Sequence, residues 1–272
     1  MSSIIFEMEK ERKFFLTFGG GGPKFNYHIG RICDEATRLN VFDKIIGLNE
    51  LSLKNDREFY SRHGRFIQHN ISKGYGRYIW KAHIVKKVMD ALMEDNDILV
   101  YADCGCTLNP DGKQRLEEYF QMVRSHESGM LGIALEDQNG GSVLAEKRFT
   151  KEDVFQYFNV DSSDQSIRDT SQLISGAIVI RKCPISEEAV DEWERASKVY
   201  NLLDDSPSQI QNDPSFDSHR HDQSVFSVIR KKYGCAKTWD ETMTFTRGGR
   251  LGDKPILATR LTHYRQWPYK LV

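Results

Sequence analysis

Short apolar runs alternate along the chain with stretches in which apolar residues recur every three or four positions. The mostly apolar runs predict buried strands at residues 13–18, 44–48, 97–102, 129–135 and 173–180. The helical spacing predicts amphipathic helices at residues 26–39, 79–93 and 114–123. Because strands that alternate with helices build a sheet covered by helices, the pattern predicts an α/β fold with a mostly parallel, twisted sheet flanked by helices on both faces.

Composition narrows the class of protein. A chain of 272 residues with 39% hydrophobic residues can bury one substantial core. A net charge of −1 argues against partners such as nucleic acid or an anionic membrane surface, which recruit basic proteins. No run of 18 apolar residues and no signal sequence is evident, so we expect no membrane span and a cytoplasmic protein. Five scattered cysteines fit reduced thiols.

The strongest candidate for chemistry is Asp103, which follows the apolar run at 98–102 and precedes small residues. Open α/β sheets bind ligands in the crevice outside the carboxyl ends of their strands. A carboxylate at this point is therefore our leading active-site residue. The alternative is that Asp103 only caps a turn.

Four glycines at 19–22 follow the first predicted strand. Backbone N–H groups in such a loop can approach a pyrophosphate. No Gly-Lys-Ser/Thr follows, however, and the spacing does not make a dinucleotide-binding fingerprint. A turn beneath a nucleotide base and a plain loop both remain open.

Cations and aromatic residues gather at 74–81, where the second predicted helix begins. Arg77 can fork onto phosphate oxygens and Lys81 can add a point charge, so both are candidates for anion binding. Trp80 is more typical of a core position.

A second polar group lies at 219–223, just before another apolar run with helical spacing. His219, His221 and Asp222 could bind phosphate, metal or a sugar hydroxyl, although Asp222 could equally be a helix cap. The polar stretch 204–218 predicts an exposed loop near a ligand. Aromatic and basic residues around His263 suggest a segment that folds back over the site.

Together these segments resemble the nucleotide-sugar-dependent glycosyltransferases of the GT-A type, from Phe14 to Trp267. The resemblance implies that the first strand and its loop hold the base, through Thr17, Phe18 and Gly19. It further implies a strand that presents Tyr101, Ala102 and Asp103 to a divalent cation, Mn²⁺ or Mg²⁺, on the donor diphosphate. His263 would be a late ligand of that cation.

Further motifs carry the same resemblance. The pair Ser175 and Gly176 is similar to a strand of the glycogenin-like transferases, and Asp222-Gln223 is similar to their Asp-Gln step beside the reacting carbon. Gly105 stands where an Asp-x-Asp motif has its second carboxylate, which weakens a hard-cation site and puts metal dependence in doubt. Among such enzymes the chain resembles the capsid-glycan xylosyltransferases of large algal viruses.

The resemblance implies a single domain over 1–272, with a nucleotide-binding half at about 12–110 and an acceptor and site-closing half at about 111–272. It implies transfer of a sugar from a nucleotide diphosphate donor, a UDP-sugar with UDP-xylose as one candidate, to a hydroxyl of a glycan acceptor. Asp222 would be the base or the carboxylate at the anomeric carbon. If Asp222 were only a helix cap, Glu136 or Asp137 would be the alternative catalytic residue. A viral member would act in the host cytoplasm.

Two other functions remain open. A sugar-phosphate nucleotidyltransferase also joins nucleotide and sugar sites on an α/β sheet, but residues 19–24 are a poor version of its triphosphate loop. A catalytically inactive carbohydrate-binding protein would explain the absent second carboxylate of the Asp-x-Asp motif.

Overall fold

The computed structural model describes residues 10–140, 144–243 and 252–261. A four-stranded sheet lies at its centre, in the order β2 (Lys44–Asn49), β1 (Lys13–Gly19), β3 (Ile98–Ala102) and β6 (Ala177–Arg181). Strand β1 pairs in parallel with both β2 and β3, whereas β6 runs antiparallel to β3. The carboxyl ends of β1 and β3 therefore meet at one edge of the sheet.

Two smaller sheets extend this arrangement. Strands β5 (Leu131–Ala134) and β7 (Ala236–Trp239) pair in parallel, and β4 (Thr107–Leu108) pairs antiparallel with β8 (Ile256–Leu257). An isolated bridge between Met130 and Ile180 joins the β5 segment to β6. The predicted mostly parallel α/β sheet is confirmed, and the structure adds that β6 pairs antiparallel with β3 in the central sheet.

The helices fall between the strands, as the pattern predicts. They are α1 (Pro23–Leu39), α2 (Glu50–Asn55), α3 (Arg57–His69), α4 (Gly74–Arg77), α5 (Trp80–Leu92), α6 (Lys113–Ser125), α7 (Glu146–Phe149), α8 (Glu152–Tyr157), α9 (Gln165–Arg168), α10 (Pro184–Ser197) and α11 (Asp222–Tyr233), with 3-10 turns at Pro110–Gly112, Tyr200–Leu202 and Glu241–Met243. Helix α1 begins three residues earlier than predicted because Pro23 suits the first helical position. No helix in these described segments has the length and apolar character needed to cross a bilayer.

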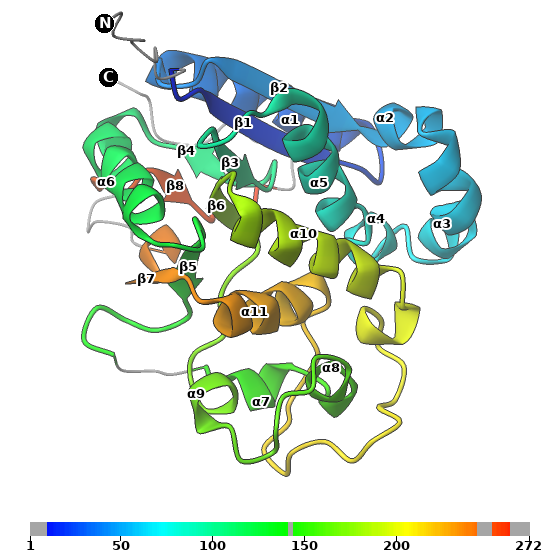
Figure 1. Cartoon of the computed structure of the whole chain (residues 1–272). Coiled ribbons are helices and arrows are strands. Elements are labelled where there is room, and N and C mark those ends of the chain that lie inside the picture. The colour runs from blue at the N-terminus through cyan, green and yellow to red at the C-terminus, as the bar shows by residue number, and fades with distance from the viewer. Residues whose placement is uncertain (1–9, 141–143, 244–251, 262–272) are drawn as a thin grey trace, which may run out of the picture.

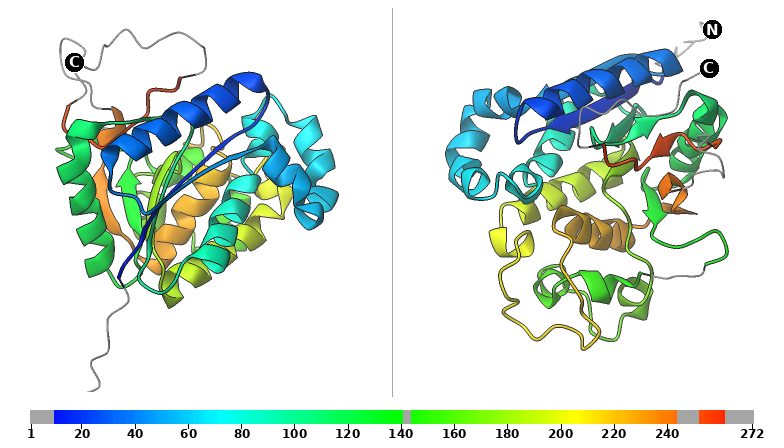
Figure 2. Two further views of the ribbon diagram at one scale, coloured as in Figure 1. Left: turned by 90° about the horizontal axis from the view of Figure 1, so that it is seen from above. Right: turned by 180° about the vertical axis from the view of Figure 1, so that it is seen from behind.

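The core lies on both faces of the central sheet. Side chains of β1 alternate, so that Phe14 and Leu16 join the core beneath α5, α10 and α11, while Phe15 joins the core beneath α1 and α6. Figures 1 and 2 show α1 and α5 on opposite faces of the strands, with α10 between α5 and α11. Alternation with burial on both sides is the expected signature of a sheet covered by two helical layers.

The predicted strand at 173–180 is divided in the structure. Leu173 and Ile174 bond to the β5 segment, through a bridge to Ala134 and a 2.9 Å hydrogen bond to the carbonyl of Ile133. Strand β6 begins only at Ala177, which pairs with Ala102 of β3. The chain thus changes partner at Ser175 and Gly176, and this crossing brings both residues to the carboxyl end of β3.

The two predicted halves share this sheet, because β6 from the second half pairs with β3 from the first. The assignment of nucleotide and acceptor binding to one half each stays a prediction.

Candidate active site

Asp103 lies directly after β3, at the edge where the carboxyl ends of β1 and β3 meet. Its backbone N–H donates to the carbonyl of Gly176 at 2.9 Å, and its Oδ1 accepts the Tyr101 hydroxyl at 2.6 Å. Tyr101 is fully buried, and burial followed by the charge of Asp103 raises the pKa of its phenol well above the ordinary value. The hydroxyl therefore stays protonated and fixes the carboxylate, whose side chain is 39% exposed.

Lys81 lies in the first turn of α5 and is the buried cation of the site. Its Nζ lies 3.1 Å from Asp103 Oδ1 and 3.1 Å from Asp222 Oδ2, and it donates to the Ser175 carbonyl at 3.1 Å. Burial by itself lowers the pKa of Lys81, but the two carboxylates outweigh burial and the pKa is raised. An ammonium has three protons, and the two carboxylates and the Ser175 carbonyl provide three acceptors for them. Binding of a phosphate by Lys81 stays a prediction.

Asp222 is the first residue of α11 and is 3% exposed. Its Oδ2 accepts the Ser175 hydroxyl at 2.7 Å in addition to facing Lys81. Burial raises the pKa of Asp222, and Lys81 opposes that rise. The cap position belongs to His221, which makes no side-chain cap bond. The carboxylate of Asp222 is thus directed to the site, and the simple helix-cap explanation does not describe its contacts.

Gly176 completes the floor of the site. A Cβ added at Gly176 would lie 3.1 Å from Asp103 Oδ2, closer than most such contacts allow. The missing side chain lets the crossing segment approach the carboxylate. Four of the predicted site residues, Lys81, Asp103, Ser175 and Asp222, therefore meet in one hydrogen-bonded group, with Gly176 beside it.

The segment that carries Arg77 has an unusual backbone. Tyr75, Arg77 and Tyr78 all have positive φ angles, of 48°, 55° and 62°, which are uncommon for side chains of this size. Arg77 is 6% exposed, and its guanidinium contacts Asn70 Oδ1 at 3.2 Å and Asp205 Oδ2 at 2.5 Å. Trp80 packs on Phe18 with ring centroids 4.0 Å apart and is a core residue, as expected.

Sequence reasoning did not single out Tyr78 as a site residue. Lys81 Nζ lies 5.0 Å from the centre of its ring. Burial, and then the charges of Asp103 and Asp222, raise the pKa of the phenol. Tyr78 therefore lies near the two carboxylates. Its position depends on a left-handed backbone conformation, which the periodicity of the sequence does not predict.

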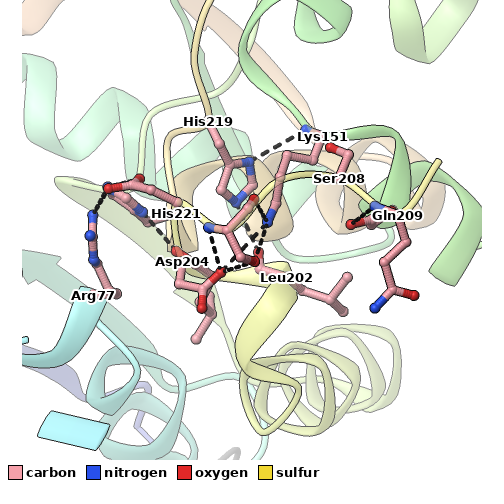
Figure 3. Close-up of polar contacts among 12 residues, drawn as sticks. Arg77, Lys151, Leu202, Asp204, Ser208, Gln209, His219 and His221 are labelled. Carbon is pink, nitrogen blue, oxygen red and sulfur yellow. Dashed lines mark hydrogen bonds and ion pairs between the residues drawn. The ribbon is translucent and has the colours of Figure 1, made fainter. Parts of the chain in front are cut away.

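The two predicted histidines, His219 and His221, form hydrogen bonds with backbone carbonyls (Figure 3). His219 Nε2 donates to the Leu202 carbonyl at 2.9 Å, while its Nδ1 accepts the Lys151 N–H at 3.4 Å. Burial lowers the pKa of His219 to about 3, so the ring is neutral. His221 Nδ1 contacts the Leu203 carbonyl at 2.7 Å, and its Nε2 lies 3.3 Å from Arg77 Nη1. Both rings thus tie the segment after α10 to the approach to α11.

The residues predicted to meet a base lie at the end of β1. The Thr17 hydroxyl donates to the Ala102 carbonyl at 2.8 Å, and Thr17, Phe18 and Ala102 are all buried. Gly19 approaches Phe25 and Ile29 so closely that a Cβ would clash. Any contact of Thr17 or Ala102 with a ligand would therefore come from the backbone.

The glycine loop has an internal partner that the sequence did not reveal. The N–H groups of Gly21 and Gly22 both donate to Glu50 Oε1, at 2.7 and 2.9 Å. Glu50 begins α2, immediately after β2. A carboxylate of the protein therefore occupies the donors that a phosphate loop would offer.

The implied divalent cation can be tested against the residues around Asp103. Gly105 contributes no ligand, and Cys104 and Cys106 are buried, with burial raising the pKa of Cys104 to about 12, so their thiols stay protonated. Within residues 10–140, 144–243 and 252–261, no three His, Cys, Asp or Glu side chains gather to hold a metal. These residues do not form a divalent-cation site. The predicted ligand His263 lies outside the described residues, so its pairing with Asp103 stays a prediction.

Comparison with known proteins gives a likeness of fold. No protein-family model matches the chain, and no curated protein matches its sequence. The structure is similar to mouse xyloside xylosyltransferase 1 in its apo form, with a TM-score of 0.40 and 9% identity over 84% of each chain. It is also similar to a glycosyltransferase involved in glycosylation of the major capsid of PBCV-1, with a TM-score of 0.40 and 10% identity over 84% of this chain and 80% of the other.

A third similar structure is the galactosyltransferase LgtC in complex with donor and acceptor sugar analogs. Its TM-score is 0.34 and its identity 10%, over 83% of this chain and 72% of the other. These three structures are glycosyltransferases by name, at 9–10% sequence identity to this chain.

Proposed function

We propose that the protein is a glycosyltransferase that moves a sugar from a nucleotide diphosphate donor, a UDP-sugar, to a hydroxyl of a glycan. One observation carries the proposal: the Lys81 ammonium joins the carboxylates of Asp103 and Asp222 at the carboxyl end of β3. Ligands of open α/β sheets bind at this edge. Carboxylates held there are suited to accept hydrogen bonds from sugar hydroxyls and to act on a reacting hydroxyl.

Asp222 is the residue to which we assign the reaction at the anomeric carbon. In the transfer, the bond between that carbon and the phosphate oxygen breaks and the nucleotide diphosphate leaves, a bond to the acceptor oxygen forms, and the proton of the acceptor hydroxyl passes to the Asp222 carboxylate. A buried carboxylate whose pKa is raised is a better proton acceptor near neutral pH than an exposed one. Lys81 and Ser175 hold its Oδ2 and so orient it.

Asp103 is assigned to donor binding. It is more exposed than Asp222 and is oriented by Tyr101 and Lys81, so its carboxylate can face a bound donor. The base of the nucleotide would lie at the neighbouring end of β1, near Thr17, Phe18 and Gly19. Arg77, beside Tyr78, is the candidate cation for the diphosphate.

The glycine loop argues against the nucleotidyltransferase alternative. Such an enzyme needs free N–H donors to grip a triphosphate, whereas Gly21 and Gly22 give theirs to Glu50. An inactive carbohydrate-binding protein would use the same carboxylates, so only turnover distinguishes it.

Product analysis tests the proposal. The purified protein is incubated with a panel of UDP-sugars, UDP-xylose first, and with glycan acceptors. Release of UDP together with a glycosylated product is the expected result. Pyrophosphate release from UTP and a sugar phosphate would instead indicate a nucleotidyltransferase, and glycan binding without turnover of any donor would contradict an enzymatic role.

A further inference from the structure

A buried arginine beside the proposed active site is paired with an exposed carboxylate. Arg77 Nη1 lies 2.5 Å from Asp205 Oδ2, with side-chain exposures of 7% and 51%. The guanidinium also contacts Asn70 Oδ1 at 3.2 Å and His221 Nε2 at 3.3 Å, and neither of these groups carries a negative charge. A poorly hydrated cation needs an anion or strong acceptors near it, so Asp205 supplies the negative charge at this point.

More groups converge on the same carboxylate. Lys73 Nζ lies 3.5 Å from Asp205 Oδ2, and His221 Nε2 lies 3.8 Å from Oδ1. Burial alone raises the pKa of Asp205, but the hydrogen bond from Arg77 and the nearby His221 outweigh it, so the pKa is lowered. Two basic side chains and an imidazole around one acidic group are the arrangement that proteins use to bind a phosphoryl group.

The backbone around these donors is strained. Arg77 has a φ of 55°, and His221 has φ 55° and ψ −128°. Such conformations persist where surrounding structure enforces them, and they cluster at functional sites. Figure 3 shows the side chains of Arg77 and His221 directed toward one another from the two strained segments.

Arg77 and His221 each lie next in sequence to a residue at the proposed catalytic carboxylates. Arg77 is followed by Tyr78, whose ring lies 5.0 Å from Lys81 Nζ, and His221 is followed by Asp222. A ligand with a phosphoryl group at Arg77 and a sugar at Asp222 has the chemistry of a nucleotide diphosphate sugar.

We infer that Arg77, Lys73 and His221 form a phosphoryl-binding site, and that the Asp205 carboxylate fills it as an internal competitor until a ligand phosphate displaces it. The identity of the ligand rests on the proposed function, whereas the exchange of anions rests on the contacts alone.

Displacement requires only a local change. The residues after Asp205 are anchored elsewhere: Lys151 donates to the Ser206 carbonyl, and Asp153 accepts the N–H groups of Gln209 and Ile210. The exposed Asp205 side chain can therefore rotate into solvent while its loop stays in position, which is a fast motion for an exposed group. Arg77 keeps an anion throughout, first the carboxylate and then the phosphate.

Calorimetric titration of the full chain with inorganic pyrophosphate and with UDP tests the inference, at one salt concentration. In Asp205→Asn the competing charge is gone, so the affinity for both probes should rise roughly tenfold, the scale of one weakened ion pair in a partly buried site. Asp217→Asn is the matched control: it removes a carboxylate of the same loop that is 61% exposed, against 51% for Asp205, and lies 3.8 Å from Arg148, so it should leave both affinities unchanged. Adding Arg77→Lys to Asp205→Asn should cancel the gain.

The outcomes separate the two proposals. Equal or weaker binding in Asp205→Asn, or an equal gain in Asp217→Asn, overturns the inference while UDP binding by the wild type leaves the proposed function intact. A gain for pyrophosphate in a protein that binds no UDP or UDP-sugar supports the anion site and contradicts the proposed function.

Discussion

Lys81 Nζ and Asp222 Oδ2 lie 3.1 Å apart at the first turns of α5 and α11, and both residues are buried. Because Asp103 faces the same ammonium at the same distance, one cation joins the strand end to two helices. The stability of the fold and the geometry of the proposed active site therefore depend on the same three side chains.

Replacing Lys81 with Met tests this dependence. The variant leaves two carboxylates close together without their cation, and breaking a buried ion pair on one side costs about 3–5 kcal/mol. We expect a loss of that size in the free energy of unfolding, measured by urea denaturation. Lys87→Met is the matched control, since Lys87 is 60% exposed on the same helix and its ion pair with Asp56 should contribute less than about 1 kcal/mol. Equal stability of Lys81→Met and wild type would contradict a central role for the ammonium.

Gly176→Ala tests the close approach at the carboxylate. The new methyl group would press on Asp103 Oδ2 at 3.1 Å, so the carboxylate must shift by a few tenths of an ångström. We expect kcat/KM for the donor to fall roughly tenfold with the fold retained, because small misplacements at a reacting site are costly. Gly30→Ala on α1, where nothing lies within 4 Å, should leave kcat/KM unchanged. An unchanged kcat/KM in Gly176→Ala would show that the position of the Asp103 carboxylate does not depend on the missing side chain at residue 176.

His219 should make stability depend on pH. Its pKa is about 3 in the folded protein and 6.5 ordinarily, so the unfolded chain binds the proton more readily. Its contribution is complete above pH 6.5 and is lost as the pH falls toward 3, by about 2 kcal/mol between pH 7 and pH 5. His219→Gln should flatten this part of the curve of unfolding free energy against pH. The exposed His69 gives the control His69→Gln, and a wild-type slope retained in His219→Gln would refute the assignment.

Much of the fold could be predicted from local pattern. The strands at 13–18 and 97–102 are apolar runs whose side chains are buried on both faces, and burial of this kind depends mainly on composition. The division of the run at 173–180 could not be predicted, because Leu173 bonds to β5 while Ala177 bonds to β3. The composition of a continuous apolar run does not indicate which strand each part of the run pairs with.

The sequence indicates residues of the candidate site but not their contacts with one another. Asp103 and Asp222 are predicted at element boundaries, where ligand-binding side chains gather, whereas Ser175 and Gly176 lie inside a predicted strand and are indicated only by the resemblance. Lys81 is predicted as a candidate for anion binding, and the structure adds that it is buried between two carboxylates from other elements of the chain. Burial of an ammonium depends on those partners, which helical periodicity cannot supply. The contact of Asp205 with Arg77 is equally remote in sequence.

The role of Asp222 at the reacting sugar is tested by the turnover number of Asp222→Asn with a UDP-sugar donor. Asn keeps an acceptor for the Ser175 hydroxyl but loses the charge that faces Lys81 and cannot take a proton. UDP affinity serves as the check on folding, and Asp217→Asn as the control for charge. We predict a turnover number lower by roughly 10²-fold or more in a variant that still binds UDP. A folded Asp222→Asn variant with the turnover number of the wild type would show that Asp222 takes no part in the reaction.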